Sequence, residues 1–410
     1  MFRLSLRRTC LWIVILTFLP LVASAADWPQ WRGANRDGKV TGFTAPQTWP
    51  KELTQKWKVT VGPGDSTPAL VGDKVYVFAR EGGDEVTLCL NAADGKETWR
   101  DKYETPAITG PDARQHPGPR SSPAVGEGKI VTLGVNGILS CLDAATHKMV
   151  WRKDEFPGAV PKFHTGFSPI IADGMAIAHL GGEGKGALMA FDLATGKIKW
   201  KWDAEGPAYA SPVVATLAGA KQIVTMTEKS VAGLALADGK LLWQLPFVAQ
   251  GMAYNAATPI IDGDTVIYVG QQRGAHAVKI EKRGNAFAYK PVWDNPEVSV
   301  QFNTPVLKDG LLFGLSDRGM LFCLDAKTGK TAWTDTTKRG GNFAAILDAG
   351  SVLLALPNTG QLIVYKPNAK QYEEVAQTKV SDTQTYAHPV IAGKRIIVKD
   401  QDSLILGTLE

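Results

Sequence analysis

The stretch FDLATGKIKW, from Phe191 to Trp200, decides the fold of this chain because variants of it recur along the sequence. Its Asp can accept hydrogen bonds from the amides of a tight turn, its Gly takes the left-handed position, and its Trp closes a return strand. The closing Trp recurs as Trp57, Trp99, Trp151, Trp200, Trp243, Trp293 and Trp333. A spacing of 40 to 52 residues is typical of propellers and other repeat folds.

Each repeat also has a recognisable start, in which a Pro precedes an alternating strand, a Gly or Asp turn and a second strand. The starting Pro recurs as Pro68, Pro123, Pro169, Pro212, Pro259, Pro305 and Pro389, and Ala345 fills the remaining position. The last repeat has no room for its outer strand before Glu410, whereas Trp57 precedes the first start. We therefore predict an all-β, eight-bladed β-propeller in which the N-terminal strand at residues 53–59 completes the last blade and closes the ring.

Residues 1–26 combine a basic start, an apolar run and small residues at the exit, which is typical of a secretory signal peptide. We predict a signal peptide at 1–26, an N-terminal extension at 27–52 and a single propeller domain at 53–410. The protein is then expected in the periplasm or secreted, as a monomer without a transmembrane segment in the mature chain. Retention of the segment as an anchor is the alternative.

The charge of the chain is nearly balanced. The full sequence has 45 Lys and Arg against 40 Asp and Glu, and residues 1–26 carry three of the Arg and no acid. The remaining net charge of +2 gives no electrostatic signature of binding to nucleic acid or to an anionic membrane. Cys89, Cys141 and Cys323 occupy one repeat position, which Ala190 fills elsewhere, so we predict free buried thiols.

A functional site is expected where the repeats differ, at the propeller mouth formed by the connections that enter each blade. The polar and aromatic residues predicted to bind a ligand or partner there are Asp65, Arg120, His164, Tyr209, Tyr254, Asn255, Asn303, Asn342, Tyr386 and His388, together with Phe163 and Phe302. The alternative is that these loops are simply polar and that the Ser or Thr immediately before most of the starting Pro residues caps the backbone.

Two further segments are candidates for partner docking. Trp28, Trp31 and Arg32 lie in the extension, where large side chains either dock a partner or plug the ring. Arg114 lies in the long Pro-rich connection at 101–120, which would act as a lid or a docking arm.

Motifs for catalysis are absent from the sequence, which has no phosphate-binding Gly loop, His-Glu-x-x-His, Cys-x-x-Cys or Gly-x-Ser-x-Gly. We predict no catalytic residue and no metal, although His164 and His388 would be base or metal ligands if they met across the mouth. His147 stands where other repeats have the turn Gly, so it is interpreted as a solvated turn residue.

The repeated Leu-Asp-x-x-Thr-Gly-Lys-x-x-Trp motif resembles the repeat of pyrroloquinoline-quinone (PQQ)-binding-like propellers, over about residues 53–410. WPQWRG at 28–33 and GPRSSP at 118–123 resemble the exported members of this group found in planctomycete-type bacteria. The group is similar to the outer-membrane assembly lipoprotein BamB, a propeller that acts as a protein-binding scaffold. The resemblance implies a non-catalytic scaffold whose partner is another exported or membrane protein.

The same superfamily includes quinone-dependent alcohol and sugar dehydrogenases, which implies an enzyme as an alternative. Those enzymes place two adjacent cysteines beside the quinone and cluster Asp, Glu and Asn around Ca²⁺. This sequence has neither feature, so no PQQ or Ca²⁺ is expected. A binder of a small polar ligand or glycan at the mouth is the other alternative.

Overall fold

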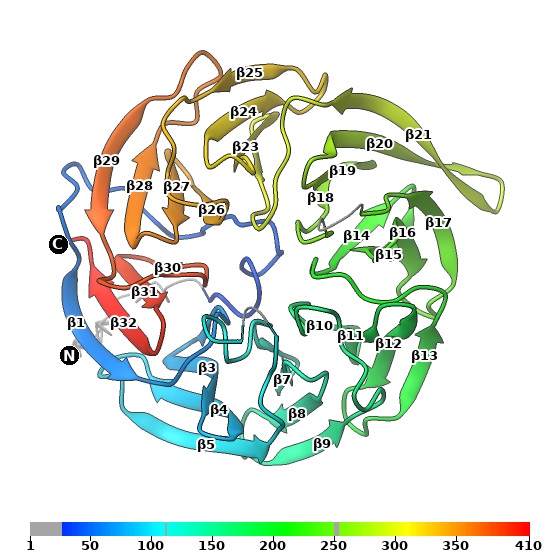
Figure 1. Cartoon of the computed structure of the whole chain (residues 1–410), viewed down its shortest axis with the longest axis horizontal. Coiled ribbons are helices and arrows are strands. Elements are labelled where there is room, and N and C mark those ends of the chain that lie inside the picture. The colour runs from blue at the N-terminus through cyan, green and yellow to red at the C-terminus, as the bar shows by residue number, and fades with distance from the viewer. Residues whose placement is uncertain (1–26, 111–112, 250–253) are drawn as a thin grey trace, which may run out of the picture.

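The computed structural model describes residues 27–110, 113–249 and 254–410, and the predicted signal peptide therefore lies outside the described residues. Figure 1 shows sheets arranged radially around a central axis, each with its first strand near the axis and its last strand at the perimeter. The described residues form 32 strands in eight four-stranded antiparallel sheets. The prediction of an all-β, eight-bladed propeller is confirmed.

The strands are numbered along the chain, and each blade is given from its inner to its outer strand. Blades one to four are β2 Ala69–Val71, β3 Lys74–Glu81, β4 Asp84–Asn91, β5 Glu97–Glu104; β6 Ala124–Gly126, β7 Lys129–Leu133, β8 Leu139–Asp143, β9 Met149–Lys153; β10 Ile170–Ala172, β11 Met175–Gly182, β12 Lys185–Asp192, β13 Ile198–Trp202; and β14 Val213–Leu217, β15 Ala220–Met226, β16 Ser230–Ala235, β17 Leu241–Pro246. Blades five to eight are β18 Ile260–Asp262, β19 Thr265–Gly270, β20 Gly274–Arg283, β21 Ala286–Asn295; β22 Val306–Lys308, β23 Leu311–Leu315, β24 Leu321–Asp325, β25 Thr331–Thr334; β26 Ala344–Ala349, β27 Val352–Pro357, β28 Gln361–Tyr365, β29 Glu374–Lys379; and β30 Val390–Ala392, β31 Arg395–Lys399, β32 Ser403–Thr408, β1 Thr54–Thr60.

The ring closes through the pairing of β1 with β32. The two strands run antiparallel from the Thr54–Thr408 pair to the Thr60–Ser403 pair, with a bulge before Trp57. β1 is therefore the outer strand of blade eight, as the surplus Trp57 predicted. Pairing of these strands satisfies the backbone groups that a terminal blade would otherwise leave exposed at its edge.

The repeated Trp joins five of the blades to the next one. The indole N–H of Trp151 donates to the carbonyl of Leu193 at 3.1 Å, and Trp57, Trp200, Trp293 and Trp333 make the same kind of bond to the following blade. The turn Gly lies under the ring: a Cβ on Gly196, whose φ is 69°, would lie 2.7 Å from Cγ of Trp151. The Trp of one repeat and the turn Gly of the next repeat thus form the contact between their blades.

The interpretation of His147 as a solvated turn residue is wrong. His147 does occupy the turn position with a left-handed φ of 64°, but its ring stacks on Trp99 with centroids 4.9 Å apart. An imidazole lies where the other blades place a Gly. Trp99 is accordingly half-exposed, and its indole N–H has no hydrogen-bond acceptor among the described residues.

The three cysteines are free and buried, as predicted. Each lies directly across from a closing Trp, in the pairs Cys89–Trp99, Cys141–Trp151 and Cys323–Trp333, and Ala190 lies across from Trp200 in the same way. A small side chain is needed at this position because it faces the indole inside the blade.

The two ends of the ring differ because the strands alternate in direction. The connections between blades and the turns between second and third strands lie at one end, which we call the mouth face. The other turns lie at the opposite end, which we call the plug face. At the start of several blades a hydroxyl accepts a bond from the preceding blade: the N–H of Thr67 donates to Ser122 at 3.1 Å, that of Ser122 to Ser168 at 3.0 Å, and that of Ser168 to Ser211 at 2.9 Å. The predicted capping hydroxyls therefore cap the adjacent blade.

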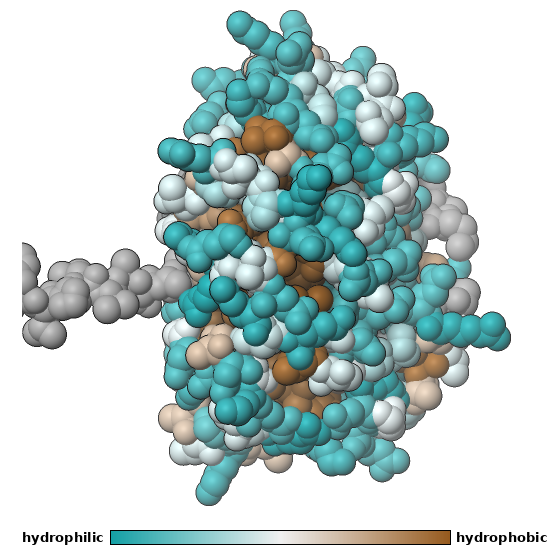
Figure 2. Space-filling view, turned by 90° about the vertical axis from the view of Figure 1, so that its left-hand side faces the viewer, coloured by the Kyte–Doolittle hydropathy of each residue, from teal (hydrophilic) through white to brown (hydrophobic). Residues whose placement is uncertain are grey.

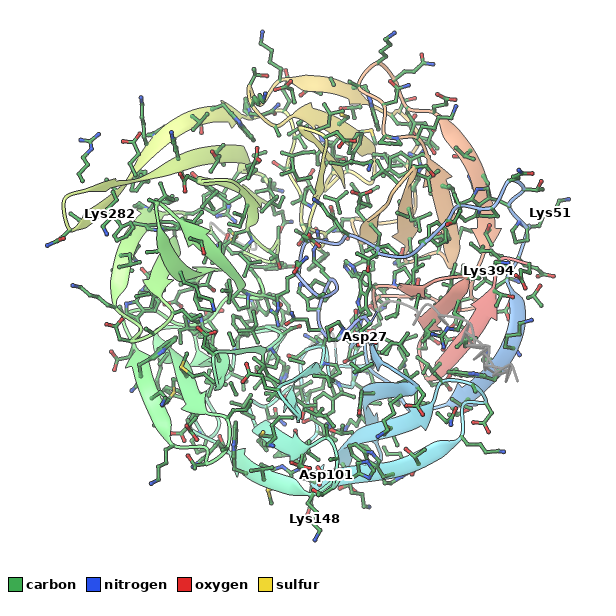
Figure 3. The ribbon with its side chains drawn as sticks, turned by 180° about the vertical axis from the view of Figure 1, so that it is seen from behind. Asp27, Lys51, Asp101, Lys148, Lys282 and Lys394 are labelled. Carbon is green, nitrogen blue, oxygen red and sulfur yellow. The ribbon has the colours of Figure 1, made fainter. Side chains whose placement is uncertain are left out.

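The N-terminal extension enters the central channel from the plug face and contacts every blade. Figure 3 shows it from behind, running from Asp27 near the axis to Lys51 at the perimeter. Its partners in blades one to eight are Leu70, Val125, Pro169, Pro212, Thr258, Thr304, Asp348 and His388. The plug interpretation of the extension is thus the one that the structure supports.

Two buried arginines hold the plug in place. Arg36 donates to the carbonyls of Ser168 and Pro212 at 3.1 Å each and to that of Pro169, and Arg32 donates to the carbonyl of Thr304 at 2.8 Å. Both guanidinium groups are buried, which lowers the pKa of Arg32 to about 10 and that of Arg36 to about 9. They remain cations at neutral pH, solvated by backbone carbonyls instead of water.

The outer wall of the ring is formed by the last strands of the blades. Figure 2 views it from the side of β1 and β29 and shows a mainly hydrophilic surface with small hydrophobic areas between. Within the described residues, no helix is long and apolar enough to cross a membrane.

Candidate functional site

The mouth face carries a continuous circuit of side chains that every blade contributes to, and we call these residues the rim. The rim consists of Asp65, His116, Arg120, Phe163, Tyr209, Tyr254, Phe302, Asn342 and Tyr386. Each lies in the connection that enters a blade, so the topology brings together residues that are far apart in sequence. Six of the ten residues predicted for the mouth are in the rim.

The half of the rim over blades three to six is aromatic. The ring of Tyr254 lies 5.4 Å from that of Phe163, 5.3 Å from that of Tyr209 and 5.5 Å from that of Phe302, measured between centroids. The hydroxyl of Tyr209 accepts a bond from the N–H of Phe163 at 3.0 Å. Phe302 is 39% exposed. Large, rigid aromatic side chains of this kind carry most of the energy in protein interfaces.

The other half of the rim is polar. Nδ1 of His116 donates to the carboxylate of Asp65 at 2.6 Å, and the His116 ring meets that of Tyr386 edge-on at 4.6 Å. The Arg120 guanidinium donates to the carbonyls of Phe163 and His116. These contacts join the long connection at 101–120 to blades one, three and eight.

The two halves are linked by Gln301. Its side-chain amide donates to the hydroxyl of Tyr254 at 2.9 Å and accepts a bond from the amide of Asn342. Phe343, next to Asn342, packs against Tyr386 at 5.3 Å and completes the circuit. The rim therefore behaves as one connected surface.

Four residues predicted for the mouth face are buried inside the ring. Asn255 donates to the carbonyls of Thr227 and Phe247, and Asn303 bonds both backbone groups of Leu315. His164 donates to the carbonyl of Thr109 at 3.1 Å, and His388 packs edge-on against Trp31 beneath the mouth. All four are less than 9% exposed and are held by contacts within the protein, although Asn255 also lines the pocket described below.

The residues predicted to dock a partner, in the extension and in the long connection, also differ in exposure. Trp28 and Arg32 are 2% and 1% exposed, so they belong to the plug and cannot face a partner. Trp31 is half-buried, with its indole N–H on the hydroxyl of Thr258 at 3.3 Å, and forms part of the channel floor. Arg114 is exposed on the long connection. The structure thus leaves Arg114 as the accessible member of this set.

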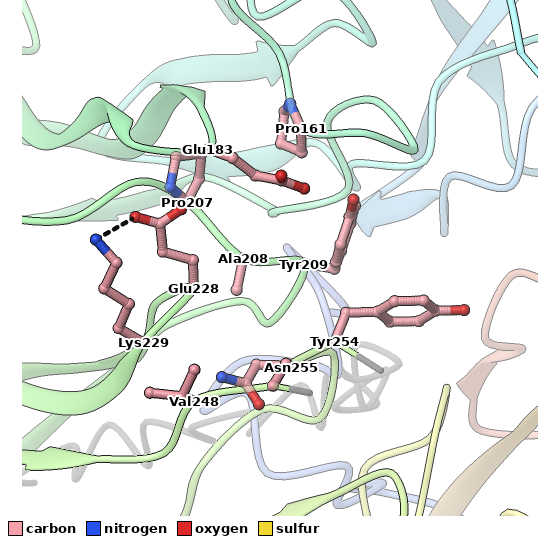
Figure 4. Close-up of a pocket in the computed structure, with 11 residues that line it drawn as sticks. Pro161, Glu183, Pro207, Ala208, Tyr209, Glu228, Lys229, Val248, Tyr254 and Asn255 are labelled. Atoms are coloured by element: carbon pink, nitrogen blue, oxygen red, sulfur yellow. Dashed lines mark ion pairs between the residues drawn. The ribbon is translucent and has the colours of Figure 1, made fainter. Parts of the chain in front are cut away.

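A polar pocket of about 270 Å³ opens on the mouth face between blades three, four and five. Figure 4 shows Glu183 and Tyr209 approaching each other across it, with the Glu228–Lys229 ion pair on its other side. Burial raises the pKa of Tyr209 to about 12, with a smaller contribution from the charge of Glu183. Burial alone would raise the pKa of Glu228, but the N–H groups of Gly184 and Gly206 hold it below its usual value.

Sequence reasoning missed part of the site. It did not assign His116 of the long connection to the mouth, and it overlooked Glu183 and Glu228. Both glutamates lie in turns between second and third strands, at 182–185 and 226–230. The alternation of strand direction was the available signal, because it places these turns on the mouth face.

Metal ligands do not gather at the described part of the mouth. Across the described ranges, no three His, Cys, Asp or Glu side chains lie together as metal ligands would. Glu85 has a pKa raised by burial, but it is fully buried between blades one and two, where it accepts bonds from the Tyr103 hydroxyl and the Val135 N–H. Its role is to join those blades.

Comparisons with known proteins agree with the fold. Residues 112–335 match the family described as outer membrane protein assembly factor BamB. The chain belongs to the BamB family. The BamB of Burkholderia pseudomallei is 24% identical over 375 residues, which are 87% of this chain and 88% of that protein.

Solved structures show which folds resemble this BamB-family propeller. BamB from Moraxella catarrhalis has a TM-score of 0.64 at 13% identity, covering 87% of this chain and 99% of that one. Quinohemoprotein alcohol dehydrogenase from Comamonas testosteroni has a TM-score of 0.69 at 16% identity, covering 94% and 81%. At these identities the likeness shows the propeller fold and nothing of the activity.

The dehydrogenase likeness raises the question of a quinone and Ca²⁺. The residues present do not fit that pair. The cysteines are buried singly in blades one, two and six, and the channel axis is filled by the buried cations Arg32 and Arg36 together with Trp31. No carboxylate cluster for Ca²⁺ occurs in the part of the chain that the structure describes. We derive no reaction through these groups.

Proposed function

We propose that this BamB-family propeller is an exported, non-catalytic scaffold that binds another exported or membrane protein through the rim. The observation that carries the proposal is the rim itself, which joins side chains from all eight blades into one aromatic and polar surface above a plugged channel. A plugged, rigid ring with variable connections presents an interface at no conformational cost, which favours docking.

The relatives support the class of partner. They are described as outer membrane protein assembly factors, and we propose that this chain likewise acts in the envelope, after cleavage of its signal peptide, as a monomer. Quinone, Ca²⁺ and other cofactors have no part in the proposal. The long connection with Arg114 would add a polar margin next to the aromatic half of the rim.

The rim can be tested with Phe302→Ser and Tyr254→Ser. Each removes a large aromatic contact, and we expect recovery of the cross-linked partner from envelope extracts to fall at least about tenfold, which corresponds to a loss of about 1.4 kcal/mol of binding energy. Ile198→Ser is the matched control because Ile198 is 50% exposed on the outer wall. Unchanged recovery with both rim variants, at unchanged melting temperature, would refute rim docking.

The pocket between blades three and five favours a second candidate, a binder of a small polar ligand or glycan. The pocket is lined by Tyr209 and Tyr254 and by the carboxylates of Glu183 and Glu228. Aromatic rings for stacking and oxygens that accept hydrogen bonds suit a sugar or another hydroxylated ligand. A panel of monosaccharides should then raise the melting temperature, and Tyr209→Phe with Glu183→Gln should abolish the shift. No shift with any sugar would exclude this candidate without affecting the scaffold proposal.

A further inference from the structure

One hairpin departs from the repeat that shapes the other blades. In regular blades the third and fourth strands are joined by the Asp-x-x-Thr-Gly turn, in which the Asp192 or Asp325 carboxylate accepts backbone bonds. In blade five, β20 and β21 are 10 residues each and stay paired out to Arg283 and Ala286. Figure 1 shows this hairpin projecting beyond the perimeter of the ring.

The projecting part of the hairpin is strongly basic. It contains Lys279, Lys282, Arg283 and Lys290 against the single acid Glu281, a net charge of +3. Residues 27–410 together carry +2, so the rest of that chain sums to −1. The weak overall charge therefore hides a concentrated patch, which explains why the whole-chain balance gave no electrostatic signature.

The cations of the patch are not neutralised within the protein. Lys279 lies directly across from Lys290 in the register, an arrangement of like charges that destabilises a strand pair. Arg283 pairs with Glu281 at 3.3 Å, but Lys279, Lys282 and Lys290 form no ion pair within the described residues. A cross-strand pair of this kind is tolerated most easily where an anionic surface neutralises it.

Apolar side chains accompany the cations. Tyr289 is 40% exposed and Val292 is 47% exposed, on either side of Lys290. Tyr289 lies directly across from Ile280 in the register, so it shares a face with Ile280 and Lys282, whereas Lys279 and Lys290 lie on the other face. Ile280 is 1% exposed and packs with Phe287 in the core shared with blade four, which anchors the base of the hairpin. The hairpin thus carries lysines on both faces, with an exposed tyrosine on the face of Lys282.

We propose that this hairpin, residues 279–292, binds the surface of a membrane that contains anionic phospholipids. Lipid phosphates attract clustered lysines, and tyrosine and aliphatic side chains partition into the interfacial region just below them. An acidic protein would neutralise the lysines but would give no reason for an exposed Tyr289 and Val292 in the same hairpin. The site is separate from the rim, so it stands or falls independently of the scaffold proposal.

The test is co-sedimentation of the purified protein with vesicles of phosphatidylcholine alone or with roughly one-third phosphatidylglycerol. We expect at least about fivefold more bound protein on the anionic vesicles, falling as added salt screens the charges. The double variant Lys279→Gln with Lys290→Gln should remove most of the difference. Lys327→Gln with Lys330→Gln, in the regular turn of blade six, makes the same charge change and should bind like the unmodified protein.

A second variant separates a membrane from an acidic polypeptide. Tyr289→Ser keeps the charge and should still reduce vesicle binding at least about twofold, because the ring inserts at the interface. Equal loss with both double variants would overturn the hairpin as the site. Competition by polyglutamate with no effect of Tyr289→Ser would overturn the membrane and assign an acidic protein instead. Matching melting temperatures exclude misfolding as the cause.

Discussion

The two faces of the ring use similar residues for opposite purposes. On the plug face, Arg32, Arg36 and Trp28 are buried and bonded to the carbonyls and strands of the blades. On the mouth face, Arg120, Tyr254 and Phe302 lie at or near the surface. The difference teaches that residue type alone does not separate a structural group from a binding group in this fold. The burial of the side chain does so.

The largest expected effect comes from removing the residues that close the ring. A chain beginning at residue 66 lacks both the plug and β1, so β32 loses its partner and the Trp57 contact disappears. We expect no cooperative thermal unfolding, measured by calorimetry. A chain beginning at residue 53 keeps β1 and loses only the plug, and should melt at least about 10 °C lower, equivalent to about 7 kcal/mol in a chain of this size. Near-native melting of the chain from residue 66 would contradict ring closure by β1.

Arg36→Met is expected to have the next largest effect. Methionine keeps much of the volume but leaves the carbonyls of Ser168, Pro169 and Pro212 without their donor. The free energy of unfolding, measured with urea, should fall by about 3–5 kcal/mol. Arg36→Lys should recover only part of this because one ammonium cannot reproduce the planar fork.

Arg114→Met is the control on the mouth face. Arg114 is exposed, so its replacement should change the free energy of unfolding by less than about 0.5 kcal/mol. Equal effects of the two substitutions would show that the plug arginines contribute no more than a surface group.

A smaller effect is expected from acidification, through His388 beneath the mouth. Burial, with a smaller contribution from the Arg32 charge, holds the pKa of His388 well below its usual value. Below pH about 6.5 the unfolded chain takes up a proton that the folded chain refuses, so stability is lost as the pH falls. The loss should approach about 1.4 kcal/mol per pH unit, and His388→Gln should remove that part of the slope. Identical slopes in urea titrations of the two proteins at pH 7 and 5.5 would contradict a buried neutral His388.

The fold was predictable because its signals are local and repeated. The Asp-x-x-Thr-Gly turn and closing Trp fix each outer hairpin, and the surplus Trp57 required a partner at the other end of the chain. His147 broke the pattern because a contact with Trp99, in another blade, decides its environment. Sequence spacing within one repeat carries no information about that neighbour.

The mouth was harder to predict because side-chain direction is lost in the connections. Asn255 and Asn303 occupy the same kind of position as Tyr254 and Phe302, one residue later, yet they turn inward to bond backbone groups. Strands alternate inside and outside with a period of two, whereas connections of different length share no such period. Which member of each pair faces solvent depends on contacts that only the assembled ring supplies.

The extension also sets an order of events during folding. Thr54 pairs with Thr408, so closure of the ring has to wait until the last strand has been made. Residues 28–40 precede every blade in the chain, and each blade presents a partner to them as it forms. Such long-range pairing is slow on its own because the entropy of loop closure is lost before the stabilising contacts have formed. The extension shortens that search, since each new blade can dock on a segment that is already present.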